Sequence, residues 1–172
     1  MPIHLNDLNV ASEVAGSRSA LIVPCNMCPG ATLAARKKRP FIQFFKSLLK
    51  SASLEQHIQG MQSQLEEQGV HTSVFRSDLP HQWFVCMWTA GRRKKLRNQA
   101  KRHDAVIVLG CDSATETARE AVDSDRCKVI PGMEVAGIMN AKLTFRFPGN
   151  ISFEDCTIVA ISRQGTEEGL SH

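Results

Sequence analysis

Short apolar runs alternate with polar segments along this chain, and the two kinds of segment predict different elements. Ser19–Pro24 and Ala105–Leu109 are almost continuously apolar, which is typical of strands that are buried on both faces of a parallel sheet. Further strands are predicted at Val70–Phe75, Gln82–Trp88 and Cys127–Pro131.

The segments between these runs have the composition and the end signals of helices. Ser53–Gln68 is polar, with Ser53 as a candidate N-cap and Gly69 as a candidate stop. Gly91–His103 is basic, and Asp112–Val122 begins with acidic and capping side chains that suit the helix dipole.

Strands that alternate with helices predict the fold class α/β, here a single-domain Rossmann-like sandwich with a mostly parallel sheet. We expect this domain to span residues 19–163, after a polar N-terminal lead-in at 1–18 and before a flexible tail at 164–172. Near the end of the domain, Leu143–Phe147 and Thr157–Ile161 are predicted strands around a Pro-Gly-Asn turn.

Composition narrows the class of protein. The chain has 172 residues, of which 42% are apolar and 22% charged, and a net charge of +4. The N-terminus is polar and has no signal-like apolar region, and no apolar stretch reaches the roughly 18 residues that a membrane span needs. We therefore expect a cytoplasmic protein that does not bind membranes, and a charge this mild does not argue for nucleic acid.

The cysteines are the strongest indication of function. Four of the six follow or end predicted strands: Cys25, Cys28, Cys86 and Cys111. Because the carboxyl ends of parallel strands line one crevice, these thiols are expected to converge in space. Cys127 instead opens its strand, so we expect it at the opposite sheet edge with a structural role.

Thiolates are soft ligands, so such a group would select zinc or an iron–sulfur cluster. Cys25-x-x-Cys28 is a usual half-site, whereas the spacings to Cys86 and Cys111 match no compact zinc finger. Two alternatives remain open at this point. Cys25 and Cys28 could be a redox dithiol, or the cysteines could be small apolar core residues.

Cys111 also stands at the start of a predicted helix, where free N–H groups favour a thiolate, a phosphate or a carboxylate. Gly110, Ser113 and Thr115 are therefore candidate cofactor-binding residues for an anionic group. The segment is not a Walker loop, and the chain contains no Gly-x-Gly-x-x-Gly, so no motif supports nucleotide binding.

Two basic segments stand out, Arg36–Arg39 and the predicted helix Gly91–His103. They are either solvated faces or docking surfaces for an acidic partner near the cysteines, since the second begins just beyond Cys86. The apolar stripe Phe41–Leu49 recurs at helical spacing and is expected to pack in the core, although a partner groove or a membrane-surface helix would show the same pattern.

Several of these features recur in one order along the chain. A cysteine pair follows the first strand, a helix ends in Glu-Glu-x-Gly, Cys86 precedes a charged helix, and Asp104–Cys111 and Val129–Glu134 follow. Over roughly residues 19–156 this order resembles the C-terminal domain family of methylenetetrahydrofolate reductase. The chain departs from that family in the segment Arg36–Ser51 and in the absence of further cysteines after Cys156.

The resemblance implies an α/β domain that binds metal or an iron–sulfur cluster through Cys25, Cys28, Cys86 and Cys111. It also implies an accessory role in anaerobic one-carbon metabolism, with a folate reductase or a corrinoid methyl-transfer component as protein partner. Two other functions remain open from the residues alone. One is a small enzyme with Cys25 or Cys111 as nucleophile and Glu134 as base, and the other is a basic interaction module.

Overall fold

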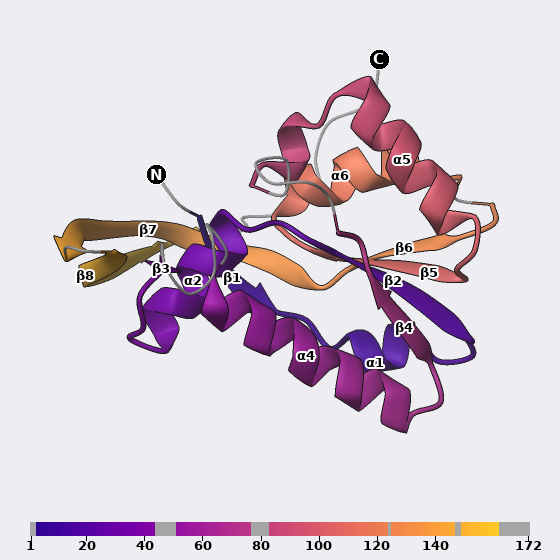
Figure 1. Cartoon of the computed structure of the whole chain (residues 1–172), viewed down its shortest axis with the longest axis horizontal. Coiled ribbons are helices and arrows are strands. Elements are labelled where there is room, and N and C mark those ends of the chain that lie inside the picture. Colours follow the sequence, from indigo (N-terminus) through magenta and orange to yellow (C-terminus); the bar gives the residue numbers. More distant parts are fainter. Residues whose placement is uncertain (1–2, 44–50, 77–82, 124, 147–148, 162–172) are drawn as a thin grey trace, which may run out of the picture.

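The computed structural model describes residues 3–43, 51–76, 83–123, 125–146 and 149–161. Its centre is a four-stranded parallel sheet in the order β4-β2-β5-β6 (Figure 1). The strands are β2 (Ser19–Pro24), β4 (His71–Val74), β5 (Ala105–Leu109) and β6 (Lys128–Pro131). The predicted α/β class and the four strands at these places are confirmed.

The strand order contains one reversal. From β2 the chain moves to β4 on one side, and then returns past β2 to β5 on its other side. Strand β2 pairs with β5 along its whole length, from Ala20 opposite Ala105 to Pro24 opposite Leu109. The carboxyl ends of β2 and β5 therefore form the switch point at which open α/β sheets bind ligands.

Helices cover both faces of this sheet (Figure 1). Helix α4 (Ala52–Glu67) lies on one face, while α5 (Ala90–Ala100) and α6 (Asp112–Ala121) lie on the other. The buried core between these layers is aliphatic, and its fully buried large side chains include Leu21, Ile22, Leu54, Leu96 and Ile107. The three helices lie where the sequence predicts them, to within a few residues, although α4 begins after Ser51 and not after Ser53.

A second, antiparallel sheet in the order β1-β7-β8-β3 corrects the expectation of a plain Rossmann-like sandwich. Its strands are β1 (Ile3–Asp7), β3 (Ile42–Gln43), β7 (Met133–Arg146) and β8 (Asn150–Ala160). Strand β7 follows β6 after the single residue Gly132, where a Cβ atom would lie only 2.8 Å from the Leu109 side chain. The chain therefore continues directly from one sheet into the other, and the predicted hairpin strands are much longer than expected.

Residues 3–18 contribute to the antiparallel sheet and to the core. They form β1 and the short helix α1 (Val10–Glu13), and Leu5, Val10 and Val14 are buried in the core. Helix α2 (Cys28–Arg36), which the sequence pattern did not reveal, holds β1 in place.

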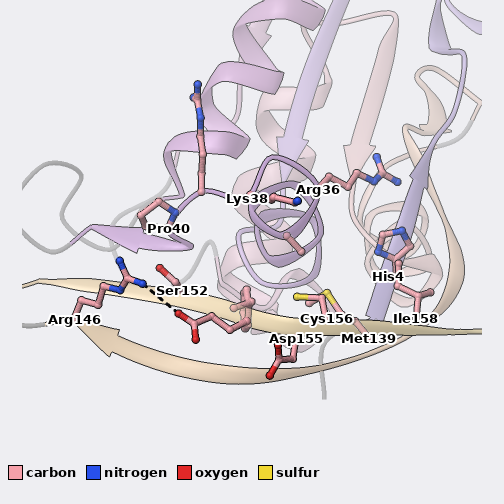
Figure 2. Close-up of a pocket in the computed structure, with 14 residues that line it drawn as sticks. His4, Arg36, Lys38, Pro40, Met139, Arg146, Ser152, Asp155, Cys156 and Ile158 are labelled. Carbon is pink, nitrogen blue, oxygen red and sulfur yellow. Dashed lines mark hydrogen bonds and ion pairs between the residues drawn. The ribbon is translucent and has the colours of Figure 1, made fainter.

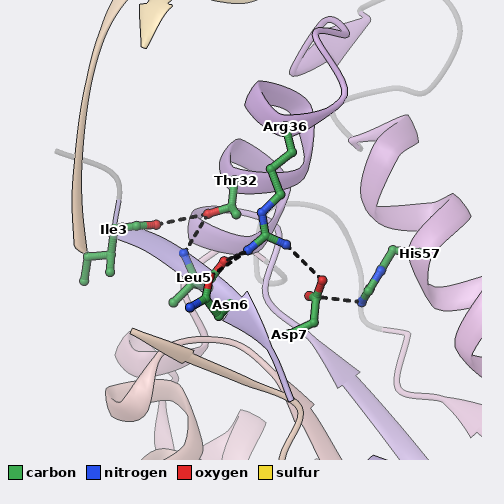
Figure 3. Close-up of polar contacts among 7 residues, drawn as sticks. All are labelled: Ile3, Leu5, Asn6, Asp7, Thr32, Arg36 and His57. Atoms are coloured by element: carbon green, nitrogen blue, oxygen red, sulfur yellow. Dashed lines mark hydrogen bonds and ion pairs between the residues drawn. The ribbon is translucent and has the colours of Figure 1, made fainter. Parts of the chain in front are cut away.

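Polar contacts join α2 to β1 (Figure 3). The Thr32 hydroxyl accepts from the Leu5 N–H at 3.2 Å and donates to the Ile3 carbonyl at 3.2 Å. The Arg36 guanidinium donates to the Leu5 carbonyl and pairs with Asp7 at 2.9 Å. Thr32 and Arg36 thus hold β1 along one face of α2. The Ile3 end of β1 lies toward the start of the helix, where its backbone contacts Cys28.

Two further expectations are corrected. The described part of the predicted strand Gln82–Trp88, residues 83–88, contains the 3₁₀ turn η1 (Val85–Met87) in place of a strand. Val85 in the turn and Trp88 directly after it are buried. Ile42–Gln43 belongs to β3 and not to a helix, and the rest of the stripe to residue 49 lies outside the described residues. The predicted tail at 164–172 also lies outside them. Within the described ranges, no helix is long and apolar enough to cross a membrane.

Candidate functional site

The four candidate cysteines lie at the switch-point end of the parallel sheet. Cys25 directly follows β2, and its N–H donates to the Leu109 carbonyl at 2.8 Å, which extends the pairing with β5. Cys111 caps the start of α6 two residues after β5, and Cys28 begins α2. Cys86 is in η1, which packs against α6. The turn brings Cys86 to this end although the predicted strand is absent.

The four thiols form one electrostatic group. The charge of Cys111 acts on the ionisation of Cys25, Cys28 and Cys86, and Cys25 is further coupled to Cys28 and to Cys86. Cys28 and Cys111 share a side-chain hydrogen bond. Segments that are far apart in the sequence therefore contribute to a single cluster of sulfur atoms.

Burial and hydrogen bonding act in opposite directions on Cys25. Burial raises the pKa of its thiol to about 11, while backbone N–H groups of Val85 and Met27 lower it. The thiol itself donates to the Trp83 carbonyl at 3.3 Å. Cys25 is thus held protonated in this structure, but its sulfur already faces two N–H donors that would stabilise a thiolate.

Cys111 and Cys28 share one proton. The hydrogen bond from Cys28 lowers the pKa of Cys111 to about 6, and the N–H groups of Ala114 and Ser113 in the first turn of α6 lower it further against the effect of burial. The same hydrogen bond is the largest cause that raises the pKa of Cys28, followed by burial, while the Ile3 N–H acts in the other direction. Of the two sulfurs, Cys111 is therefore the one on which negative charge is favoured.

Cys86 differs from the other three because its side chain is exposed. Partial burial raises the pKa of its thiol, and the nearby Cys111 charge raises it further. Cys86 therefore forms the solvent-facing side of the cluster, whereas Cys25 and Cys111 are buried.

The donor set fits a soft metal ion, since thiolates select zinc or iron–sulfur clusters. As the side chains are placed, however, no group of three or more His, Cys, Asp or Glu residues in the described ranges could hold a metal ion. The sulfurs of the cluster are near one another but are not arranged as ligands. Binding therefore needs the cysteine side chains to turn toward a common centre.

The candidate anion-binding residues have other partners. The buried Thr115 hydroxyl donates to the Cys111 carbonyl at 3.4 Å, and the Ala114 N–H donates to the same carbonyl at 2.9 Å. The backbone N–H groups of Ser113 and Ala114 also lower the pKa of the Cys111 thiol. Gly110 lies against Cys25, because a Cβ at Gly110 would be 3.6 Å from the Cys25 Cβ. In this structure the first turn of α6 favours the charged form of the Cys111 thiol.

Aromatic side chains cover the cluster on the side of the Cys25–Cys28 turn. Trp83, whose carbonyl accepts from Cys25, packs edge-on against Phe41 with ring centroids 5.7 Å apart. Met27, between the two cysteines, packs against the same apolar group. A hydrophobic shell of this kind limits the access of water to a metal site and tunes its properties.

The remaining cysteines lie elsewhere. Cys127 precedes β6 and is buried, and its pKa is raised to about 11 by burial and by the Asp104 carboxylate at the start of β5. It is therefore at the amino ends of the strands, opposite the cluster. Cys156 is exposed in β8.

A separate pocket of about 720 Å³ lies between the end of α2 and the β7–β8 hairpin (Figure 2). Its lining includes Lys38, Arg39, Phe153 and Cys156, but none of the four clustered cysteines. Arg146 in its wall pairs with Glu154 at 3.4 Å, so part of its positive charge is compensated. This pocket is distinct from the candidate site.

Some contacts of the site could not be inferred from the residue types. The Trp83 carbonyl and the Ile3 N–H are backbone groups, so no side-chain signal marks them. The helical start at Cys28 was signalled only by the proline that follows it, since proline is favoured in the first turn of a helix.

Comparison with known proteins adds no identification. The chain matches no protein-family model, no curated protein and no solved structure.

Proposed function

We propose that this chain binds a metal ion or an iron–sulfur cluster through Cys25, Cys28, Cys86 and Cys111, and acts as an accessory metal-binding or electron-transfer protein. The observation that carries the proposal is the electrostatic coupling of the four thiols at the switch point of the parallel sheet. Such a point is where open α/β sheets bind their ligands.

The hydrogen bonds around the sulfurs favour a metal over simple packing. A cysteine that serves only as a small apolar core residue does not need hydrogen bonds from N–H groups. Backbone hydrogen bonds nevertheless lower the pKa of the thiols of Cys25, Cys28 and Cys111. In thiolate-bound centres, N–H groups directed at sulfur stabilise the charge and tune the site. Burial is the main cause that raises the pKa of Cys25 and Cys86, and the charge of Cys111 adds to it. A bound cation would favour the thiolate forms and so act against both effects.

The two kinds of centre differ in what they would do. Zinc in a site of four sulfur ligands is structural, and its binding contributes to folding. An iron–sulfur cluster would carry electrons, and the exposed Cys86 would be its solvent-facing ligand. We favour the cluster, because an exposed ligand gives electrons a short route to a partner.

The setting of this function is proposed from the family resemblance. A domain that resembles the C-terminal family of methylenetetrahydrofolate reductase would work in anaerobic one-carbon metabolism, with a folate reductase or a corrinoid methyl-transfer component as its partner. The cysteine cluster supports the metal-binding part of that role and does not bear on the pathway.

The test compares three single variants prepared under anaerobic conditions. Cys25→Ser and Cys111→Ser should lose bound metal, because a hydroxyl stays protonated and is a poor ligand for soft ions. Cys127→Ser is the matched control, since that buried thiol lies at the opposite sheet edge. Full metal content in both site variants would reject the proposal. Thermal melts of the same samples separate a structural ion, whose loss lowers stability, from a redox centre in a self-sufficient fold.

One observation favours a second function, that of an enzyme with Cys111 as nucleophile. Cys111 is a thiolate at the start of a helix, as activated cysteines often are. Rapid alkylation of Cys111 by iodoacetamide at neutral pH in the metal-free protein would support this function. Slow alkylation of every cysteine would exclude it.

A further inference from the structure

The turn η1 and helix α5, which follows it after Trp88 and Thr89, together carry an exposed cysteine of the cluster, exposed apolar side chains and exposed lysines. We define the η1–α5 surface by the exposed residues of this segment together with the partly exposed Arg92: Phe84, Cys86, Met87, Arg92, Lys94 and Lys95.

Its apolar centre lies on the turn that carries Cys86. Phe84 and Met87 are 47% and 76% exposed, although they flank the buried Val85 and Trp88. Exposed apolar side chains such as these lie next to Cys86 and are followed by the basic residues of α5. An apolar centre with a polar rim is typical of a small docking site. Methionine suits such a place because its flexible side chain adapts to a partner.

The rim of the surface is positively charged. Helix α5 contains no acidic residue, so its basic side chains are not neutralised within the helix itself. In the described part of the chain, its ion pairing is confined to Arg93, which pairs with Glu120, while Arg97 donates to the Ala121 carbonyl at 2.9 Å. These two contacts hold α5 against α6 and leave Lys94 and Lys95 exposed on another side.

The rim begins close to Cys86. Only Trp88 and Thr89 separate η1 from α5. The Arg93 guanidinium in α5 donates back to the Trp88 carbonyl at 3.3 Å. Lys94 and Lys95 lie in the second turn of α5. The further basic residues Lys101 and Arg102 lie beyond the other end of the helix, about 10 Å away along its axis, since each residue adds about 1.5 Å.

We infer that the η1–α5 surface docks an acidic electron-carrier protein, which would place carboxylates on the lysines and an apolar contact on Phe84 and Met87. The choice of an electron carrier rests on the proposed function, because Cys86 is the exposed ligand of the cluster. The acidic character rests on charge complementarity, which guides encounter and orientation between redox partners. Interfaces of this class are small and transient.

The experiment titrates the purified full chain with a plant-type [2Fe–2S] ferredoxin, which is small and acidic, and follows binding by calorimetry. A basic cytochrome c and a short DNA duplex are the comparison probes. We expect binding of the ferredoxin that weakens strongly between low and high salt, and no binding of the cytochrome. Tighter binding of the duplex than of the ferredoxin would overturn the inference, because the basic face would then be a nucleic-acid surface.

Matched double variants locate the contact on α5. Lys94→Glu with Lys95→Glu should weaken ferredoxin binding by about tenfold or more, whereas Lys101→Glu with Arg102→Glu should weaken it by less than about threefold. Both variants change the net charge equally on exposed residues, so equal losses would show unspecific attraction and contradict the assignment. Met87→Ser should also weaken binding, with little salt dependence of the loss.

Metal content is measured in the same samples, so that failure of this inference and failure of the proposed function can be told apart. Metal-loaded protein that does not bind the ferredoxin overturns the docking surface alone. Metal-free protein that binds it with the same dependence on Lys94 and Lys95 retains the docking surface and overturns the metal-binding proposal.

Discussion

At the scale of single residues, the proton shared by Cys28 and Cys111 decides the chemistry of the site. Two neighbouring thiolates would repel each other. A proton that stays on one sulfur and forms a hydrogen bond to the other therefore stabilises a single negative charge on the pair. The charge is favoured on Cys111 because the hydrogen bond from Cys28 lowers its pKa, and the backbone N–H groups of Ala114 and Ser113 in the first turn of α6 lower it further. Cys111 is therefore the sulfur of this pair that favours the thiolate, which is the form of cysteine that binds metal ions.

A substitution at Cys28 tests this account. In metal-free protein the thiolate of Cys111 should form with a midpoint near pH 6, and Cys28→Ala should raise that midpoint because the donor that stabilises the charge is lost. Ultraviolet thiolate absorbance against pH measures it, with Cys127→Ala as the control that should leave the midpoint unchanged. An unaltered midpoint in Cys28→Ala would show that the hydrogen bond does not set the ionisation of Cys111.

The sign of the pH effect on stability follows from the same group. Because the pKa of Cys111 is lower in the folded chain than its ordinary value of 9.0, its contribution is complete above that value and is lost as pH falls toward about 6. Chemical denaturation of the metal-free protein at several pH values should show this contribution disappear in Cys111→Ser. The same slope in the variant and in the wild type would assign it to another group.

That Cys25 and Cys111 lie at the same end of the sheet could be predicted from the sequence, because they follow strands that pair in parallel. Cys86 reaches that end through the turn η1, which the sequence did not predict. The division of charge between Cys28 and Cys111 depends on α2, whose only sequence signal is the proline after Cys28. It also depends on the Ile3 N–H and on the rotation of side chains, which have no sequence signal.

At the scale of elements, the turn from β5 into α6 positions Cys111. Gly110 is required there by space, because a Cβ would lie 2.7 Å from the Ala114 Cβ and 3.6 Å from the Cys25 Cβ. Any side chain at this position would push α6 away from β2 and so separate Cys111 from Cys25.

We expect Gly110→Ala to lower the free energy of unfolding by about 1–3 kcal/mol, as overpacking of a close contact does. It should also reduce metal retention. Adding Ala114→Gly removes the atom that the new methyl group would meet, so the double variant should recover metal binding although a glycine in the helix costs about 1 kcal/mol. Metal analysis and denaturant melts of both proteins measure this. Equal defects in the single and double variants would mean that the contact is not the cause.

A substitution at Cys127 tests whether the amino ends of the parallel strands are separate from the proposed metal site at their carboxyl ends. Its buried thiol lies near Asp104 at the amino ends of the strands, so Cys127→Ala should lower stability by roughly 1–2 kcal/mol through lost packing and leave metal content intact. Loss of metal in this variant would place Cys127 in the site and contradict the arrangement.

Elements with a strong local signal were predictable, and those that depend on tertiary contacts were not. The continuous apolar runs of β2 and β5 specify buried strands. Gln82–Trp88 has an equally apolar composition, but its described residues find no strand partner and form the turn η1 instead. Strand β1 is short and depends on the contacts that Thr32 and Arg36 of α2 make with it.

At the scale of the whole molecule, the site exists because the order of strands in the sheet reverses between β2 and β5. The α/β class could be inferred from alternating strands and helices, while the antiparallel sheet could not. Strand β7 begins one residue after β6, and its pairing with β1 brings together residues that are more than a hundred positions apart. Such long-range pairing has no signature in local periodicity.

The central claim is that four cysteine sulfurs hold one metal centre. The most direct measurement is X-ray absorption at the metal edge, combined with metal analysis, on full-length protein purified without oxygen. We predict four sulfur ligands at about 2.3 Å around zinc or around each iron of a cluster, the protein thiolates being joined in a cluster by inorganic sulfide. A fully folded protein that contains no metal, or a metal without sulfur ligands, would contradict the account.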